Sequence, residues 1–299
     1  MRLQWSFFRE AADQWLEHNA PRLGAALAYY TILSLAPLLV VVVALCGLAF
    51  GDDAVRGQLY WEIKDVVGSQ GAAFVQSLLV GAHEPATGIT ASAAGFVVLI
   101  AGASGVFGEL RDTLNYIWDA PVPKSSGFGR IVRYRVFCFA MVLGFGFLLV
   151  VSLALSAGVQ ALGSFASHRL AIDPRLLEIV NFAVTIVVTG VLFALIYRVI
   201  PEVPIDWADV GVGAAVTAVF FAVGKFLIGF YLGTAGVGSA YGAAGSLVVL
   251  LVWVYYSAQI FLYGAEFTHV YASHRGSPAI QSAISNAGLP AGSESPPQP

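Results

Sequence analysis

The chain has 299 residues, of which 58% are hydrophobic and only 11% are charged, and its formal net charge is −3. Soluble domains carry about 25% charged residues, so this composition excludes an ordinary soluble domain, whose surface needs more polar side chains. The small net charge gives no basis for a nucleic-acid partner. We therefore expect an all-α, polytopic membrane protein whose partner is the lipid bilayer.

Residues 2–19 have the pattern of an amphipathic helix that lies in the membrane interface. Tryptophans on the apolar side of such a helix suit the headgroup layer. Pro21 is expected to break the chain before the first span, so residues 1–20 are predicted to form a separate interfacial segment. The apolar face consists of Trp5, Phe8, Ala12, Trp15 and Leu16.

Six apolar runs are long enough to cross a hydrocarbon core about 30 Å thick at about 1.5 Å per helical residue. They predict six transmembrane helices within residues 21–272. The tail, residues 273–299, is rich in Ser, Pro, Ala and Gly, and this composition favours disorder. The predicted spans are Leu23–Phe50, Ile89–Phe107, Val136–Ala157, Ile179–Ile200, Val210–Leu232 and Leu247–Phe267.

Basic residues are distributed unevenly between the loops. With the N-terminus in the cytoplasm, the inner segments carry most of the Lys and Arg residues, and the loop from Arg111 to Arg135 contributes the largest share. Cytoplasmic loops are enriched in basic residues. Both termini are therefore predicted to be cytoplasmic.

Pro37 lies in the middle of the first span. It removes one backbone hydrogen bond and frees the carbonyl of Leu33. Two interpretations stay open. The helix has a kink whose freed groups are satisfied locally by Thr31 or Ser34, or it is a broken helix that lines a cavity.

The second span ends in a charged segment, residues 104–118, in which Arg111 and Asn115 share one helix face. One interpretation is a solvated, basic cytoplasmic face with Trp118 as an interface anchor. The other is a gate or a cytoplasmic vestibule.

Further along, Asp206 is well placed to cap the fifth span, because Asp is a favoured N-cap residue.

Two features of the fifth span need an explanation. Lys225 lies about seven residues, roughly 10 Å, from the outer end of this span, and a centred Lys costs about 2.5–3.5 kcal/mol. It is either a structural or snorkelled lysine, or a functional one that points inward to an aromatic face or to freed carbonyls. Gly229 and Gly233 form a GxxxG pair, which serves helix packing within the chain or a contact between copies in a homo-oligomer.

The last span carries a polar stripe. Tyr256, Gln259, Tyr263 and Glu266 are spaced three, four and three residues apart, so they share one helix face. A polar face in lipid must turn towards other helices or a wet cavity. At about 1.5 Å per residue, Glu266 belongs to the inner rim and Gln259 to the inner half. The stripe either lines a path or joins helices.

Catalytic and metal-binding patterns are absent from the sequence. The five His residues show no HExxH or HxH spacing, and no GxSxG occurs. We therefore expect no enzyme activity, no cofactor and no metal site.

Four stretches carry a resemblance to a known family, in order, over about residues 20–272: AALAYYTILSLAPLLVVVVAL, ASGVFGELRDTLNYIW, LFALIYRVIPEVPIDWADVGVGA and KFLIGFYLGTAGVGSAYGAAGSLVVLLVWVYYSAQIFLYGAEFTHVYA. They resemble the YihY/virulence factor BrkB family of bacterial inner-membrane proteins. The resemblance implies a six-helix multi-pass protein of the bacterial plasma membrane, and it supplies no catalytic residues. An older family label, ribonuclease BN, is disfavoured because nuclease chemistry needs metal-binding clusters or basic grooves. The resemblance adds weight to the matching polar positions Tyr30, Asn115, Lys225, Tyr241, Gln259 and Glu266.

Two functions compete, and the sequence names no substrate for either. A transporter or exporter of a small or lipid-like solute is indicated by Lys225, the kink at Pro37 and the polar stripe. A membrane protein that organises envelope components is indicated by the basic inner loop, the interfacial helix and the tail. A cavity that reaches Lys225 and Gln259 from one side would favour the first, and a solid bundle in which these side chains satisfy each other would favour the second.

Overall fold

The computed structural model describes residues 2–50, 64, 71–77, 105–120, 174–203, 205–234, 241 and 244–275, without the side chains of residues 2–5, 36–50, 174–178, 180–181 and 233. The described residues are helical or in turns, and none of them is in a strand. Shorter helices cover residues 71–77 and 105–117. The predicted span Val136–Ala157, residues 89–104 and the tail from residue 276 lie outside the described residues. The long helices are α1 (Arg2–Glu17), α2 (Ala20–Phe50), α6 (Pro174–Val199), α7 (Trp207–Thr234) and α9 (Gly245–Arg275).

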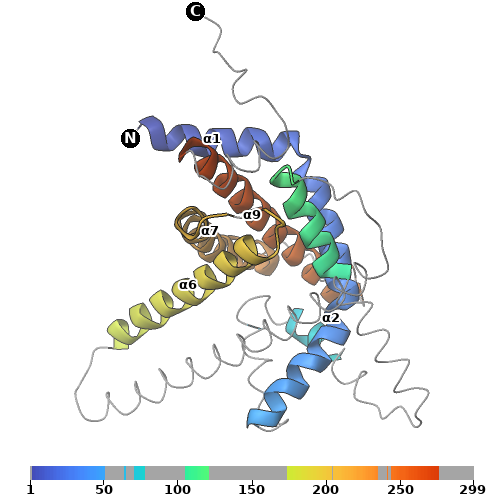
Figure 1. Cartoon of the computed structure of the whole chain (residues 1–299). Helices are drawn as coiled ribbons and strands as arrows, with labels where there is room; N and C mark the ends of the chain where they lie inside the picture. Colours follow the sequence, from blue (N-terminus) through green and yellow to red (C-terminus); the bar gives the residue numbers. More distant parts are fainter. Residues whose placement is uncertain are drawn as a thin grey trace, which may run out of the picture.

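Helix α9 is the centre of the described bundle, because it contacts α1, α2 and α7, while α6 packs on α7. In Figure 1, α1 lies across one end of α9, and the helix 105–117 lies close to α2. The core between these elements contains fully buried side chains such as Leu114, Ile117, Tyr197 and Leu262. The Tyr197 hydroxyl donates to the carbonyl of Phe261 at 2.7 Å, which joins α6 to α9.

Asn19 makes the sharp turn between α1 and α2. Its φ is 52°, the left-handed conformation in which Asn is tolerated after a helix end. Its amide binds the Leu16 carbonyl of α1, and its own carbonyl accepts from Arg22 at 2.9 Å, which starts α2. The chain therefore bends at Asn19 and not at Pro21, which lies inside the first turn of α2, where a missing N–H does little harm.

Glycine and threonine alternate across the contact between α7 and α9. A Cβ atom at Gly213 of α7 would overlap Thr268 of α9, and one at Gly264 of α9 would overlap Thr217 of α7. Each threonine hydroxyl also donates to the carbonyl of the glycine four residues earlier in its own helix, at 2.7 Å. The hydroxyls are thus satisfied within each helix, and the two backbones approach closely.

Three of the described helices have the length and apolar composition to cross a membrane: Phe182–Val199, Trp207–Leu232 and Gly245–Arg275. Each of these segments overlaps most of one predicted span, in order the fourth, the fifth and the sixth. Large apolar side chains point outward from α7, with Phe226 70% and Phe230 75% exposed, as expected of a surface covered by lipid. Helix α9 continues to Arg275, two turns beyond the predicted end at Phe267, because it also packs on α1.

Candidate functional site

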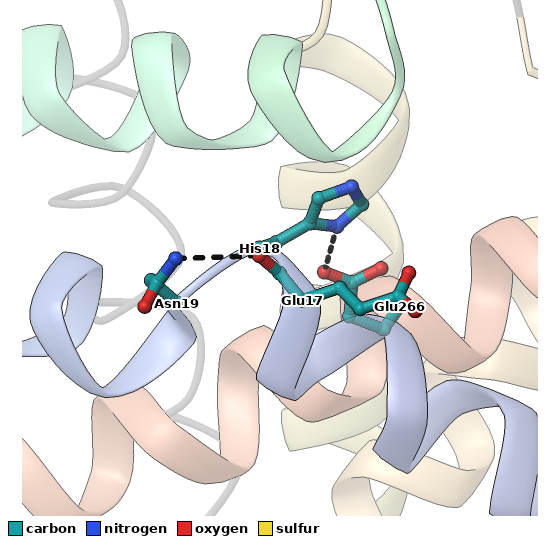
Figure 2. A network of polar contacts seen from close by, with 4 residues as sticks. All are labelled: Glu17, His18, Asn19 and Glu266. Atoms are coloured by element: carbon teal, nitrogen blue, oxygen red, sulfur yellow. Dashed lines mark hydrogen bonds and ion pairs between the residues drawn. The ribbon is translucent and has the colours of Figure 1, made fainter.

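A fully buried carboxylate lies at the end of α9 that contacts α1. The Glu266 side chain is 0% exposed, and its Oε1 atom lies 2.7 Å from Nδ1 of His18. His18 belongs to the turn between α1 and α2 and is 21% exposed. Figure 2 shows the imidazole pointing at the Glu266 carboxylate, while the side chain of Asn19 turns back to the Glu17 carbonyl. The pair joins two segments that are 248 residues apart.

Aromatic rings and two further ionisable groups surround this pair. The His18 ring meets the edge of Tyr116 at a centroid distance of 5.2 Å. One turn along α9 from Glu266, the His269 ring meets Trp118 at 5.1 Å. Asp119 acts electrostatically on both Glu266 and His269. We call Glu266, His18, His269 and Asp119 the α9 polar cluster.

The C-terminal end of the helix 105–117 positions Tyr116, Trp118 and Asp119 around the His18–Glu266 pair. Asp119 has a φ of 47°, the Ala120 amide binds the Asn115 carbonyl at 2.9 Å, and the Asp119 amide binds Tyr116. This pattern is the Schellman ending, in which glycine is the usual left-handed residue. Asp119 takes that place, and from there its carboxylate acts on Glu266 and His269, the two members of the cluster on α9.

Several buried polar atoms on the predicted polar stripe of α9 and near it have no hydrogen-bond partner among the described residues. In the described part of the chain, Gln259 has no partner for either amide atom, and Glu266 has none for Oε2. Such groups are rare in folded proteins unless water or a ligand satisfies them. The other such atoms close to the site, on α1, α9 and the end of the helix 105–117, are Gln14 Oε1, Trp15 Nε1, Trp118 Nε1 and His269 Nδ1.

Gln259 and Tyr256 are the two residues of the predicted stripe nearest the N-terminal end of α9, and each lies against a glycine. A Cβ atom at Gly24 of α2 would overlap the Gln259 amide, and one at Gly224 of α7 would lie 3.2 Å from the Tyr256 hydroxyl. The stripe therefore faces α2 at one position and α7 at another. Tyr263 faces a third element, because its hydroxyl donates to the Phe8 carbonyl of α1 at 2.9 Å.

Asn115 binds the turn between α6 and α7 and does not join the polar stripe. Its Oδ1 atom accepts from the Glu202 amide at 2.8 Å, and Arg111, one turn earlier, forms an ion pair with the Glu202 carboxylate.

On the other face of the helix 105–117, burial and the Asp112 carboxylate raise the pKa of Glu109. Burial also raises the pKa of Asp112, against the opposing effect of Arg111.

The same turn ends in the predicted cap of α7. The Asp206 carbonyl accepts from the amides of Asp209 and Val210 at 3.1 Å, and α7 begins at Trp207. Asp206 is therefore the N-cap, as predicted.

The remaining predicted site residues are dispersed. Lys225 is half-buried on α7, and none of the ion pairs or cation–π contacts between described residues includes it. Tyr30 is partly exposed and lies beside Gly105, and Tyr241 is 59% exposed. Helix α2 continues through Pro37, whose side chain lies outside the described residues.

Sequence reasoning identified Glu266 but missed its partner His18 and its neighbour His269. The spacing of His269, three residues after Glu266, could have placed it on the same side of the helix. His18 could not have been found in this way, because only the packing of α1 on α9 brings it near. In the described part of the chain, no group of three His, Cys, Asp or Glu side chains is arranged to hold a metal ion.

Comparison with known proteins places the chain in a family. The family model of virulence factor BrkB matches residues 11–286. The UPF0761 membrane protein of Stenotrophomonas maltophilia (strain K279a) is 28% identical over 279 residues, which cover 91% of this chain and 62% of that protein. The chain thus spans less than two thirds of this relative's length.

Two shorter relatives match along most of their length. The UPF0761 membrane protein of Mannheimia succiniciproducens is 26% identical, with 87% of each protein covered. That of Haemophilus influenzae is also 26% identical, with 84% of this chain and 89% of the relative covered. No solved structure matches the chain. Because the family model covers nearly the whole chain and three of the described helices are long and apolar enough to span a bilayer, this protein is a membrane protein of the BrkB family.

Proposed function

We propose that the chain is a transporter or exporter of a small or lipid-like solute, with six transmembrane helices in the bacterial plasma membrane and both termini in the cytoplasm. Helices α2, α6, α7 and α9 would supply four of the six spans. Predicted spans Ile89–Phe107 and Val136–Ala157 would supply the other two.

The observation that carries this proposal is the unsatisfied amide of Gln259. Both of its polar atoms are buried and have no hydrogen-bond partner among the described residues, although the residue lies well inside the apolar length of α9. A side chain that only joined helices would have its donors and acceptors paired, because an unpaired buried polar group costs about 1–3 kcal/mol. A passing solute or its water shell would satisfy the amide.

The polar stripe gives the direction of the path. Gln259 and Glu266 are seven residues apart, roughly 10 Å along the helix, and Glu266 also has an oxygen without a partner. Intramembrane polar and ionisable groups commonly mark substrate or ion pathways. The path would run from the α9 polar cluster, at the cytoplasmic side, past Gln259 towards the level of Tyr256.

The test compares the solutes of cells and medium by mass spectrometry in strains with matched membrane levels of the protein. The strains carry a deletion, the wild-type gene, Gln259→Leu, or Leu251→Met as a control on the exposed side of α9. We expect the wild type and Leu251→Met to restore a solute distribution that the deletion changes, and Gln259→Leu to fail. Equal profiles for the deletion and the wild type would refute transport, and full restoration by Gln259→Leu would refute the path along the stripe.

A further inference from the structure

The Glu266 carboxylate is buried, and among the described residues it contacts an imidazole that reaches the surface. Its Oε1 atom is bonded to His18 at 2.7 Å, and its Oε2 atom has no partner in the described part of the chain. The carboxylate is fully buried, whereas the imidazole is one-fifth exposed. His18 is therefore the link between this buried acid and solvent.

An imidazole in this position can carry a proton in either direction. Nδ1 binds the Glu266 carboxylate, and Nε2 lies on the opposite side of the ring (Figure 2). When a proton binds Nε2, the proton on Nδ1 can pass to Oε1 of Glu266, which leaves a neutral imidazole and a protonated carboxyl group. The net result is one proton taken from solvent and held on Glu266, with no other reactant.

The charged groups around Glu266 allow such a change. Asp119, at the end of the helix 105–117, acts on Glu266 with negative charge, and His269 is the ionisable neighbour on α9 itself. From α1, Glu17 is exposed beside His18. The acid of α7, Asp209, is engaged by Arg275 at 3.8 Å. No described basic side chain other than His18 pairs with Glu266, so no described Arg or Lys holds the carboxylate ionised.

From this geometry we infer that Glu266 and His18 form a proton-binding site at the cytoplasmic end of the polar stripe, and that its proton drives solute movement past Gln259. The coupling rests on the proposed function, whereas the proton site does not. A buried acid that exchanges its proton through one imidazole is protected from solvent except along that route, which is the property a coupling site needs.

The experiment uses the purified full-length protein in lipid nanodiscs. Infrared difference spectra between acid and alkaline buffers report the C=O stretching band of protonated carboxyl groups. We expect a titrating band in the wild type that is lost in Glu266→Gln and kept in Glu10→Gln, whose carboxylate forms an exposed pair with His274 at 3.4 Å. In His18→Gln, which retains Glu266, the midpoint of this band should shift, because the carboxylate loses the imidazole that lies 2.7 Å from its Oε1 atom.

Identical difference spectra for the wild type and Glu266→Gln would overturn the inference. An unchanged midpoint in His18→Gln would do the same, even if Glu266→Gln failed to assemble. A titrating Glu266 band in a protein whose deletion changes no solute would retain the proton site and overturn its coupling to transport. A solute effect that depends on Gln259 but persists in Glu266→Gln would retain transport and overturn the coupling.

Discussion

Thr268 of α9 occupies the space that the missing side chain of Gly213 leaves on α7. Four residues along each helix the relationship recurs with the partners exchanged, between Thr217 and Gly264. The hydroxyls are bonded within their own helices, so the contact between the helices is one of shape. Stability in this region should therefore respond to added volume more than to lost polarity.

Gly213→Ala should destabilise the protein, and Gly211→Ala should not. The new methyl group at position 213 would overlap Thr268. The new methyl group at position 211 would have no atom within 4 Å. Overpacking costs about 1–3 kcal/mol, and Ala in place of an exposed helical Gly gains about 0.5–1 kcal/mol. Thermal unfolding of the detergent-purified variants, followed by circular dichroism, measures both effects. Equal melting temperatures would show that α7 and α9 are not in close contact at Gly213.

Gly24→Ala should be destabilising only while Gln259 is present. The added methyl group would overlap the Gln259 amide, and Gln259→Ala removes that amide. We expect the double variant to lose less unfolding free energy than the sum of the losses in the two single variants. The difference should be about 0.5–3 kcal/mol, as is usual for contacting residues. A double-mutant cycle of melting measurements checks the coupling. Strict additivity would place Gln259 away from α2.

His18→Ala should destabilise the protein more than His274→Ala. Loss of His18 leaves the buried Glu266 carboxylate without its partner, at a cost of about 1–3 kcal/mol. His274 and Glu10 are both exposed, and surface pairs contribute about 0–1 kcal/mol. Chemical unfolding of the two variants at one pH compares these costs. A loss of the same size in both would mean that Glu266 is not buried in the membrane-embedded protein.

Asn115→Ala should loosen the turn between α6 and α7. The Asn115 side chain accepts the Glu202 amide proton, and a hydrogen bond of this kind contributes about 0.5–1.5 kcal/mol. Hydrogen exchange measured by mass spectrometry should accelerate in peptides that contain residues 200–203. Asp112→Asn is the matched control, because Asp112 lies on the other face of the same helix and the Glu202 amide binds Asn115 instead. Unchanged exchange in Asn115→Ala would contradict the contact.

The proposed topology predicts opposite labelling of two exposed positions. Tyr241 and Ser273 are both exposed, and they lie before and near the end of α9, respectively. With Cys46 and Cys138 replaced, an impermeant maleimide should label Tyr241→Cys in intact spheroplasts. It should label Ser273→Cys only after permeabilisation. The reverse pattern would invert the topology and place the α9 polar cluster outside.

Composition and run length by themselves determined that the chain is a helical membrane protein, because burial of long apolar segments in lipid does not depend on which helices are neighbours. The same local physics placed the cap at Asp206 and the polar stripe on one face of α9. The break between the first two helices was misplaced at Pro21, because the left-handed conformation of Asn19 has a weaker sequence pattern than a proline.

Only the tertiary structure decided which polar residues meet. His18 and Glu266 are 248 residues apart, and no periodicity within either segment encodes their contact. Packing within the chain was one expectation for Gly229, which faces open space, and the glycines that lie against another helix include Gly24, Gly213 and Gly264. A glycine allows close approach only where another helix arrives, and the arrangement of helices depends on the shapes of all the faces that pack together. For this reason the polar stripe was visible in the sequence, while the site at its end was not.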